Sequence, residues 1–224
     1  MYDHLEQVEQ YTGRKITRLS ARYSFEHLLL DYQPKIRKNS HHAQGLSFPS
    51  ARIRWCTRWL KIDVIEHYVK TLRECYAPVQ YLGIAADEAQ RAKEKEYPLI
   101  EWGWTETDCM DYCRRKGFDW GGLYDIFPRV SCWCCPLQSQ EELRMLRKHF
   151  PGLWNKLLAW QERTWRRFKP NFSVQELEAR FQLEEERARQ GLSVNGRCKE
   201  FRKALKDMLR EQEGDWKHED GLAV

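Results

Sequence analysis

The sequence predicts an α/β fold whose C-terminal third is α-helical. The stretch "APVQYLGIA" (77–85) is a continuous apolar run, which is typical of a buried parallel strand. It lies between two segments with helical spacing of apolar residues, at 55–72 and 105–117. Strands that alternate with helices indicate a parallel sheet covered by helices. After residue 140 the apolar residues keep to a helical spacing, so we expect helices there.

The N-terminal segment predicts helix, strand and helix in turn. Apolar residues recur at helical spacing over 2–12, and Gly13 follows where a helix C-cap would lie. Residues 15–21, "KITRLSA", then predict a short strand. Residues 24–32 predict a second helix, with Ser24 as its N-cap.

A long basic loop is expected at residues 33–54, which contain two prolines, paired histidines and many cations. Loops of this length in compact chains are usually functional or unfolded. The stretch "YPLIEW" (97–102) predicts another short strand. In the helix expected at 105–117, Thr105 and Asp108 predict a capping box, and Gly117 closes the helix.

The C-terminal third predicts two helical regions. From 141 to about 168, leucines and Phe150 keep to a spacing of three or four residues. The region 173–212 is highly charged, has few large apolar residues and is interrupted at 191–196 by "GLSVNG".

The composition limits the classes of protein. The 224 residues are 42% hydrophobic and 13% aromatic, which excludes a disordered chain. The net charge of +5 fits an anionic partner, but ordinary solubility explains so small an excess more simply. No apolar run approaches the ~20 residues of a membrane helix, and the first residues do not resemble a signal peptide. We therefore expect a cytoplasmic protein without membrane contact.

Eight cysteines in a reducing compartment suggest metal binding or redox chemistry. The stretch "VSCWCCPL" places Cys132 and Cys135 in a CxxC, with Cys134 between them. This spacing allows two thiols in one turn to reach a single metal ion, and it is also the spacing of redox motifs. Cys109 and Cys113 lie four residues apart on one helix face, where they could be ligands or small buried apolar residues.

Cys56 is the candidate for a further ligand, because the cations around it in "RIRWCTRWLK" favour its thiolate form. The spacing therefore favours a metal or cluster at Cys56, Cys132 and Cys135. Thiolates hold both zinc and iron–sulfur clusters, so the pattern leaves the kind of metal open.

Four stretches together resemble a known family: "RWCTRWLK", "YLGIAADEAQR", "YPLIEWGWTETDC" and "GLYDIFPRVSCWCCPLQ". They look like the phosphoadenosine phosphosulfate (PAPS) reductase family. The resemblance is strongest to phage and prophage members related to the sulfur-handling component of DNA phosphorothioation systems. It runs from the first residue to about residue 165, and the order and spacing of the four motifs make it specific.

The resemblance implies the PP-loop, or adenine nucleotide alpha hydrolase-like, fold, with a parallel sheet that has helices on both faces. It implies binding of ATP or PAPS and an iron–sulfur cluster, most simply 4Fe-4S, with zinc as the alternative. Residues 1–140 would form the family domain and 141–224 a helical C-terminal region.

Carried over by position, the resemblance implies two groups of site residues. The metal ligands would be Cys56, Cys132 and Cys135. For Cys134, which lies between them, three alternatives stay open: a further thiol of the site, a sulfur acceptor or a buried residue. The residues that bind phosphate or sulfate, or lie beside it, would be Arg52, Arg54, Lys61, Asp87, Glu88, Arg91 and Arg129. Guanidinium groups and fixed cations are the side chains that such anions need.

One family motif is absent. The phosphate-binding loop Ser-Gly-Gly-x-Asp-Ser does not occur in this sequence, and Met1 aligns with the second helix of the family pattern. The expected sheet is therefore incomplete. Either a partner chain or upstream peptide supplies the missing strands, or the chain is a truncated or repurposed form.

Two functions follow from these observations. The first is nucleotide-dependent sulfur chemistry by an iron–sulfur protein, either reduction of a sulfonucleotide or sulfur transfer. The alternative is a non-catalytic protein on a remnant fold, with a structural zinc site, that binds nucleic acid or protein. Its contacts would come from the basic loop at 35–58 and from "TWRRFK" and "KEFRKALK". Whether the chain is an enzyme stays open at this point.

Overall fold

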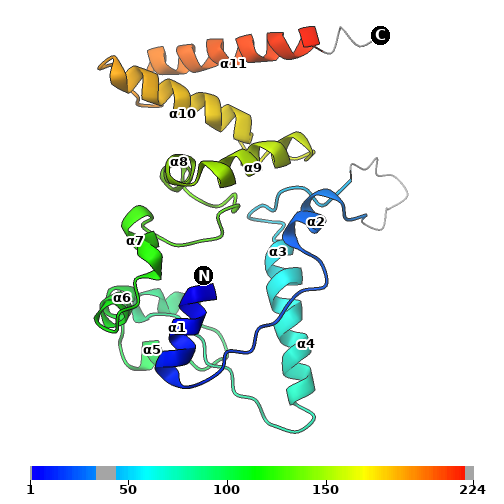
Figure 1. The fold of residues 1–224 in the computed structure, drawn as a ribbon, viewed down its shortest axis with the longest axis vertical. Coiled ribbons are helices and arrows are strands. Elements are labelled where there is room, and N and C mark those ends of the chain that lie inside the picture. Colours follow the sequence, from blue (N-terminus) through cyan, green and yellow to red (C-terminus); the bar gives the residue numbers. More distant parts are fainter. Residues whose placement is uncertain (1, 34–43, 220–224) are drawn as a thin grey trace. The chain divides into compact units, whose positions relative to one another are not determined.

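The structure is a computed structural model that describes residues 2–33 and 44–219, and the side chains of 3–33 and 44–211. Part of the predicted basic loop, residues 34–43, lies outside the described residues. Helices make up most of the described residues, which contain no strand or sheet (Figure 1). The predicted α/β parallel sheet, and with it the incomplete PP-loop sheet, is therefore wrong.

The apolar run at 77–85 is irregular and pairs with another segment at a single point. Tyr81 forms an isolated parallel bridge with Glu96, where the amide of Leu82 donates to the Glu96 carbonyl at 2.9 Å. The side chains of Val79 and Tyr81 are 62% and 68% exposed. A buried parallel strand needs neighbours on its edges and cover on both faces. In the described chain this segment has neither, which explains the wrong prediction.

The two other predicted strands also differ from the structure. At 15–21, the amide of Ile16 donates to the Glu9 carboxylate at 2.7 Å rather than to a neighbouring strand. At 97–102, the chain forms the short helix α5 (Pro98–Glu101). Proline is well suited to the first turn of a helix, because its missing N–H needs no partner there.

The chain divides into two compact units, each built from two segments. Unit 1 consists of Met1–Tyr23 and Trp55–Val130, and unit 2 of Ser24–Arg54 and Ser131–Val224. The division at residue 140 inferred from the family resemblance is a separate matter and stays a prediction.

Unit 1 contains short helices around a small core. The predicted helix at 55–72 is confirmed, and it runs through α3 (Trp55–Thr57), a π-helical turn η1 (Arg58–Ile62) and α4 (Asp63–Leu72). The other elements are α1 (Tyr2–Thr12), η2 (Ala86–Arg91), α5, α6 (Glu106–Arg115), η3 (Trp120–Gly122) and α7 (Leu123–Ile126). The buried apolar side chains described in this unit are Trp55, Ala85, Tyr97 and Phe118.

The capping box at the start of α6 is confirmed. The amide of Asp108 donates to the Thr105 hydroxyl at 3.2 Å, and the amide of Thr105 donates to the Asp108 carboxylate at 2.9 Å. Each bond satisfies an amide that has no partner inside the helix.

Unit 2 holds most of the buried apolar surface. Its helices are α2 (Phe25–Leu30), α8 (Gln140–His149), α9 (Pro151–Glu162), α10 (Val174–Arg189) and α11 (Lys199–Glu219). The predicted Ser24 cap of α2 is confirmed, and α10 and α11 lie side by side, joined by the predicted interruption at 191–196 (Figure 1). The core side chains include Leu28, Leu29, Phe48, Leu143, Leu157, Phe168, Leu177, Phe181 and Phe201. No helix in the described chain has the length and apolar character needed to cross a membrane.

Two groups of charged side chains connect α8 to α10. Arg147 donates to both oxygens of Glu178, at 2.8 and 2.9 Å, and Trp154 Nε1 donates to the same carboxylate at 2.5 Å. Arg144 pairs in the same two-bonded way with Glu184, at 2.6 and 3.0 Å. Two-bonded pairs of this type are the strongest ion pairs in proteins. They fix the register of α8 against α10.

We expect these pairs to make unit 2 acid-sensitive. Burial acts to raise the pKa of Glu178, but hydrogen bonds from Arg147 and Trp154 outweigh it, so the pKa is lowered. A carboxyl whose pKa is lower in the folded state stabilises the fold above its unfolded pKa, and this contribution is lost as the pH falls through the folded value. The free energy of unfolding should therefore decrease as the pH drops below about 4.5, the ordinary value. Urea titrations at a series of pH values measure this. Glu178→Gln should show a weaker acid dependence, and an identical dependence in both proteins would contradict the assignment.

Gly45 occupies a position that excludes other residues. Its φ is +79°, its amide donates to the Tyr32 carbonyl at 3.0 Å, and the next amide, of Leu46, donates to the Leu28 carbonyl at 2.9 Å. A Cβ atom on Gly45 would overlap the Leu29 carbonyl. This close approach of two backbones joins the end of the basic loop to α2.

Gly45→Ala should destabilise the full chain by more than about 3 kcal/mol, since backbone must move to accommodate the methyl group. Gly13→Ala is the matched control, because Gly13 also has a positive φ, of +64°, but has open space around it. That variant should lose only about 1 kcal/mol from the left-handed conformation. Urea unfolding measures both, and equal losses would contradict the role of the close approach.

Candidate functional site

The three neighbouring cysteines lie in a tight turn of unit 2. The amide of Cys135 donates to the Cys132 carbonyl at 3.0 Å, and the amide of Gln138 donates to the Cys135 carbonyl at 3.2 Å. Cys132 is exposed, Cys135 is half-buried and Cys134 is only 8% exposed. The turn therefore leaves the two CxxC thiols accessible and buries the thiol between them.

The buried side chain of Gln138 hydrogen-bonds to this turn. Its side chain is 4% exposed, and its Nε2 donates to the Cys132 carbonyl at 2.9 Å and to the Ser131 hydroxyl at 3.2 Å. Buried polar side chains need such partners to offset the loss of water. Gln138 thus holds the first residues of the cysteine segment close to its last.

The side chain of Lys169 hydrogen-bonds to residues 136–138, which follow the cysteines. Its Nζ donates to the Pro136 carbonyl at 2.8 Å and to the Gln138 carbonyl. Burial lowers the pKa of Lys169, and the nearby charges of Cys135 and Glu142 act in the opposite direction. The cysteine turn therefore has a half-buried ammonium group beside it, contributed by a residue more than thirty positions later in the chain.

Trp133 anchors the turn to the core of unit 2. Its ring packs against Trp160, with centroids 5.1 Å apart and an interplanar angle of 32°. Trp160 Nε1 in turn donates to the Glu26 carboxylate at 2.9 Å. Hydrogen bonds from Lys156 and Trp160 lower the pKa of Glu26. Aromatic packing of this kind fixes the orientation of the turn.

The predicted metal ligands fall in both units. Cys56 is half-buried at the start of α3 in unit 1, whereas Cys132, Cys134 and Cys135 belong to unit 2. Among the described residues, no group of three or more His, Cys, Asp or Glu side chains is arranged to hold a metal ion. The turn thus brings Cys132 and Cys135 into one turn of backbone, and two thiols are not a complete set of ligands.

The remaining cysteines have other surroundings. Burial raises the pKa of Cys109, with smaller effects from Cys113 and nearby carboxylates, and burial also raises the pKa of Cys113. Both residues are half-buried, so the two alternatives for this pair, ligands or small apolar residues, stay open. Cys75 is exposed, and the Cys198 thiol donates to the Glu200 carboxylate at 2.6 Å.

The predicted anion-binding residues do not form one described cluster. Arg52 and Arg54 are exposed in unit 2, and Lys61, Asp87, Glu88, Arg91 and Arg129 belong to unit 1. Arg91 is paired with Glu88 at 2.5 Å on the surface of η2. The Asp87 carboxylate accepts from the amide of Glu106 at 3.2 Å, at the start of α6. Three of these seven side chains, Asp87, Glu88 and Arg91, therefore have partners close by in unit 1.

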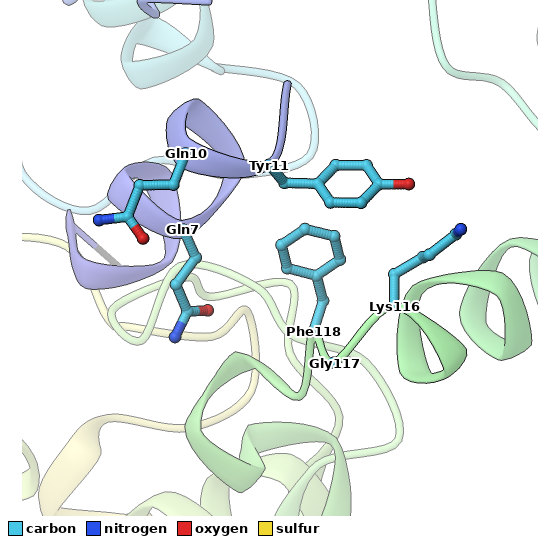
Figure 2. Close-up of a pocket in the computed structure, with 6 residues that line it drawn as sticks. All are labelled: Gln7, Gln10, Tyr11, Lys116, Gly117 and Phe118. Carbon is cyan, nitrogen blue, oxygen red and sulfur yellow. The ribbon is translucent and has the colours of Figure 1, made fainter. Parts of the chain in front are cut away.

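Unit 1 also has an open pocket of about 440 Å³ that the sequence did not indicate. Figure 2 shows its lining residues, which belong to α1 and to the segment that directly follows α6: Gln7, Gln10, Tyr11, Lys116, Gly117 and Phe118. The rings of Tyr11 and Phe118 meet edge to face, with centroids 5.5 Å apart. A hydrogen bond with Tyr112, and next the one with Lys116, lowers the pKa of Tyr11. None of the predicted site residues lines this pocket.

The comparisons with known proteins give distant relatives only. Uncharacterized protein MJ0066 of Methanocaldococcus jannaschii is 24% identical over 166 residues, which covers 68% of this chain and 31% of the relative. Uncharacterized protein MJ0973 of the same organism is 22% identical over 120 residues, which covers 48% of this chain and 29% of the relative. No family model and no solved structure matches the chain. The chain thus spans about 30% of the length of these relatives.

Lys169→Met should loosen the cysteine turn, because two carbonyls lose their donor. We expect a loss of about 1–3 kcal/mol in the free energy of unfolding and faster alkylation of buried Cys134. Urea unfolding measures the first effect, and mass spectrometry of peptides after timed alkylation measures the second. Lys148→Met, at an exposed position on α8, is the matched control. Unchanged alkylation of Cys134 in Lys169→Met would contradict the role of Lys169.

Proposed function

We propose that this chain is an iron–sulfur protein in which Cys132 and Cys135 supply two of the cluster's thiolate ligands, and that it acts in nucleotide-dependent sulfur chemistry. The observation that carries the proposal is the cysteine turn. Two accessible thiols three positions apart are held in one turn by the 3.0 Å bond between the Cys135 amide and the Cys132 carbonyl.

The surroundings of the turn support thiolate ligation. Cysteine thiolates are the usual ligands of iron–sulfur clusters, and they bind zinc equally readily. The amide of Gln138 and the ammonium of Lys169 hold the backbone on both sides of the thiols. A positive charge beside the site also offsets the negative charge of bound thiolates.

Further ligands must complete the site. The family resemblance assigns Cys56 to this role, and its half-buried thiol lies at the start of a helix. Cys134 is the weaker candidate, because its side chain is buried. Its position between the ligands suits a structural thiol better than a sulfur acceptor.

The resemblance to PAPS reductases extends the proposal to a substrate class. A bound cluster would supply electrons or hold sulfur, and an adenine nucleotide or sulfonucleotide would be the partner in reduction or sulfur transfer. This part of the proposal rests on the sequence motifs, since the described residues form no parallel sheet. A partner chain that supplies a phosphate-binding loop belongs to the same proposal.

The metal content of the chain tests the central claim. Protein purified without oxygen should contain iron and acid-labile sulfide in near-equal amounts, with broad absorption from thiolate-to-iron charge transfer. Cys135→Ser should lose both, because one ligand is missing. Cys75→Ser, at an exposed cysteine outside the turn, is the matched control and should keep both.

Two other outcomes of the metal analysis would contradict parts of the proposal. Zinc without iron would replace the cluster by a structural zinc site and remove the support for redox chemistry. Equal metal content in the parent and in Cys135→Ser would contradict ligation by the turn. Addition of ATP or PAPS to cluster-loaded protein then tests the nucleotide part separately, by equilibrium binding.

A further inference from the structure

The helix α11 carries five exposed cations along one side. Lys199, Arg202, Lys203, Lys206 and Arg210, here called the basic stripe, are all exposed. With 3.6 residues per turn, these five positions fall within an arc of about 100° around the helix axis. Along the helix they extend over about 16 Å at 1.5 Å per residue. The basic stripe is therefore an unbroken strip of positive charge along one side of α11.

The other faces of α11 have different characters. The acidic residues Glu200, Asp207 and Glu211 share a separate arc beside the basic stripe. The apolar residues occupy the third side, where Phe201 is fully buried. The guanidinium groups of Arg180 and Arg187, both from α10, lie 5.6 and 5.9 Å from the centre of the Phe201 ring. The apolar side of α11 is thus turned toward α10, and the basic stripe is left to solvent.

The cations of the basic stripe differ from most others in unit 2. Arg163, Arg167 and Arg180 pair with Asp31, Glu176 and Glu184, at 2.9, 3.0 and 2.8 Å. In "TWRRFK", Arg166 donates to the Phe48 carbonyl and Lys169 holds the cysteine turn, so this stretch is occupied within the unit. No described carboxylate lies within ion-pair distance of the five stripe residues.

Like charges within the basic stripe repel one another, and Glu200 and Asp207, three or four positions from Lys203, offset part of this repulsion. Three of its pairs are like charges four positions apart: Lys199 with Lys203, Arg202 with Lys206, and Lys206 with Arg210. Each such pair destabilises a helix by about 0.2–0.5 kcal/mol. Lys199 also lies in the first turn, where the helix dipole disfavours a cation. An anion with several charges along a line would relieve all of these repulsions.

We propose that the basic stripe of α11 binds the phosphate backbone of a nucleic-acid duplex. A duplex carries one negative charge per about 1.7 Å of its axis, so a stripe of this length faces several phosphates. Single strands are usually bound through exposed aromatic rings, and the described stripe has none, since Phe201 is buried. Helices that bind anionic membranes insert their apolar side, which here faces α10. Recognition is therefore electrostatic and independent of sequence.

Fluorescence anisotropy of a labelled duplex DNA, titrated with the full chain at several salt concentrations, tests the proposal. Five contacts predict that log K falls with log salt at a slope of about −4.5, with a dissociation constant of about 10⁻⁴–10⁻⁶ M at physiological salt. The triple variant Lys203→Gln, Lys206→Gln, Arg210→Gln should bind more weakly, with a slope shallower by about 2.7. Circular dichroism establishes that the variant keeps its helix content.

A control with the same change in net charge separates the stripe from general charge effects. Lys70→Gln, Lys93→Gln and Arg114→Gln remove three exposed cations of unit 1. This control should bind the duplex like the parent. Equal weakening in both triple variants would overturn the proposal, as would absence of duplex binding at low salt. Tighter binding to vesicles containing phosphatidylserine than to the duplex would also overturn it and identify the stripe as a membrane contact. The proposal does not depend on the metal content of the chain.

Discussion

The loop between α9 and α10, residues 163–173, is the part of unit 2 on which the other contacts depend. Phe168 is the buried residue of this otherwise exposed or half-buried loop, and backbone groups that are buried beside it need partners within the protein. Gln161, at the end of α9, supplies several of them. Its Oε1 accepts from the amide of Phe168 at 2.8 Å and from that of Val174 at 3.4 Å, and its Nε2 donates to the Arg166 carbonyl at 3.1 Å. One buried amide side chain thus sets the path of the loop.

From this loop, contacts reach two other parts of unit 2: residues 47–48 and the cysteine turn. The amide of Arg166 donates to the Ser47 hydroxyl at 2.9 Å, and Phe168 meets Phe48 edge to face with centroids 5.0 Å apart. On its other side, Lys169 holds the carbonyls that follow the cysteines. The position of the cysteine turn therefore depends on residues far away in the sequence. Loss of the Gln161 hydrogen bonds would therefore shift Lys169 and, with it, the cysteine turn.

Local signals in the sequence predicted local structure well. The caps at Ser24 and Thr105 depend on hydrogen bonds between residues three positions apart, and both are present. The cysteine turn is likewise visible in the CxxC spacing, because such a spacing needs only one turn of backbone. Lys169 was missed, since nothing near it in the sequence indicates contact with residues 136–138. Long-range contacts of this kind leave no periodic pattern.

The wrong prediction of a sheet has a related cause, because a sheet also depends on contacts between distant residues. It affects the nucleotide-binding part of the proposed function and not the metal-binding part. The run at 77–85 has the composition of a buried strand, but a sheet also requires neighbouring strands, and the described residues offer Tyr81 a single bridge to Glu96. Nucleotide binding in open α/β folds occurs at the carboxyl ends of parallel strands. Without such strands, Asp87 and Arg91 have local contacts in place of an anion site. Thiolate ligation requires a turn that presents two thiols and further ligands that complete the site, and a parallel sheet is not among these requirements. The nucleotide part does depend on it, or on strands from another chain.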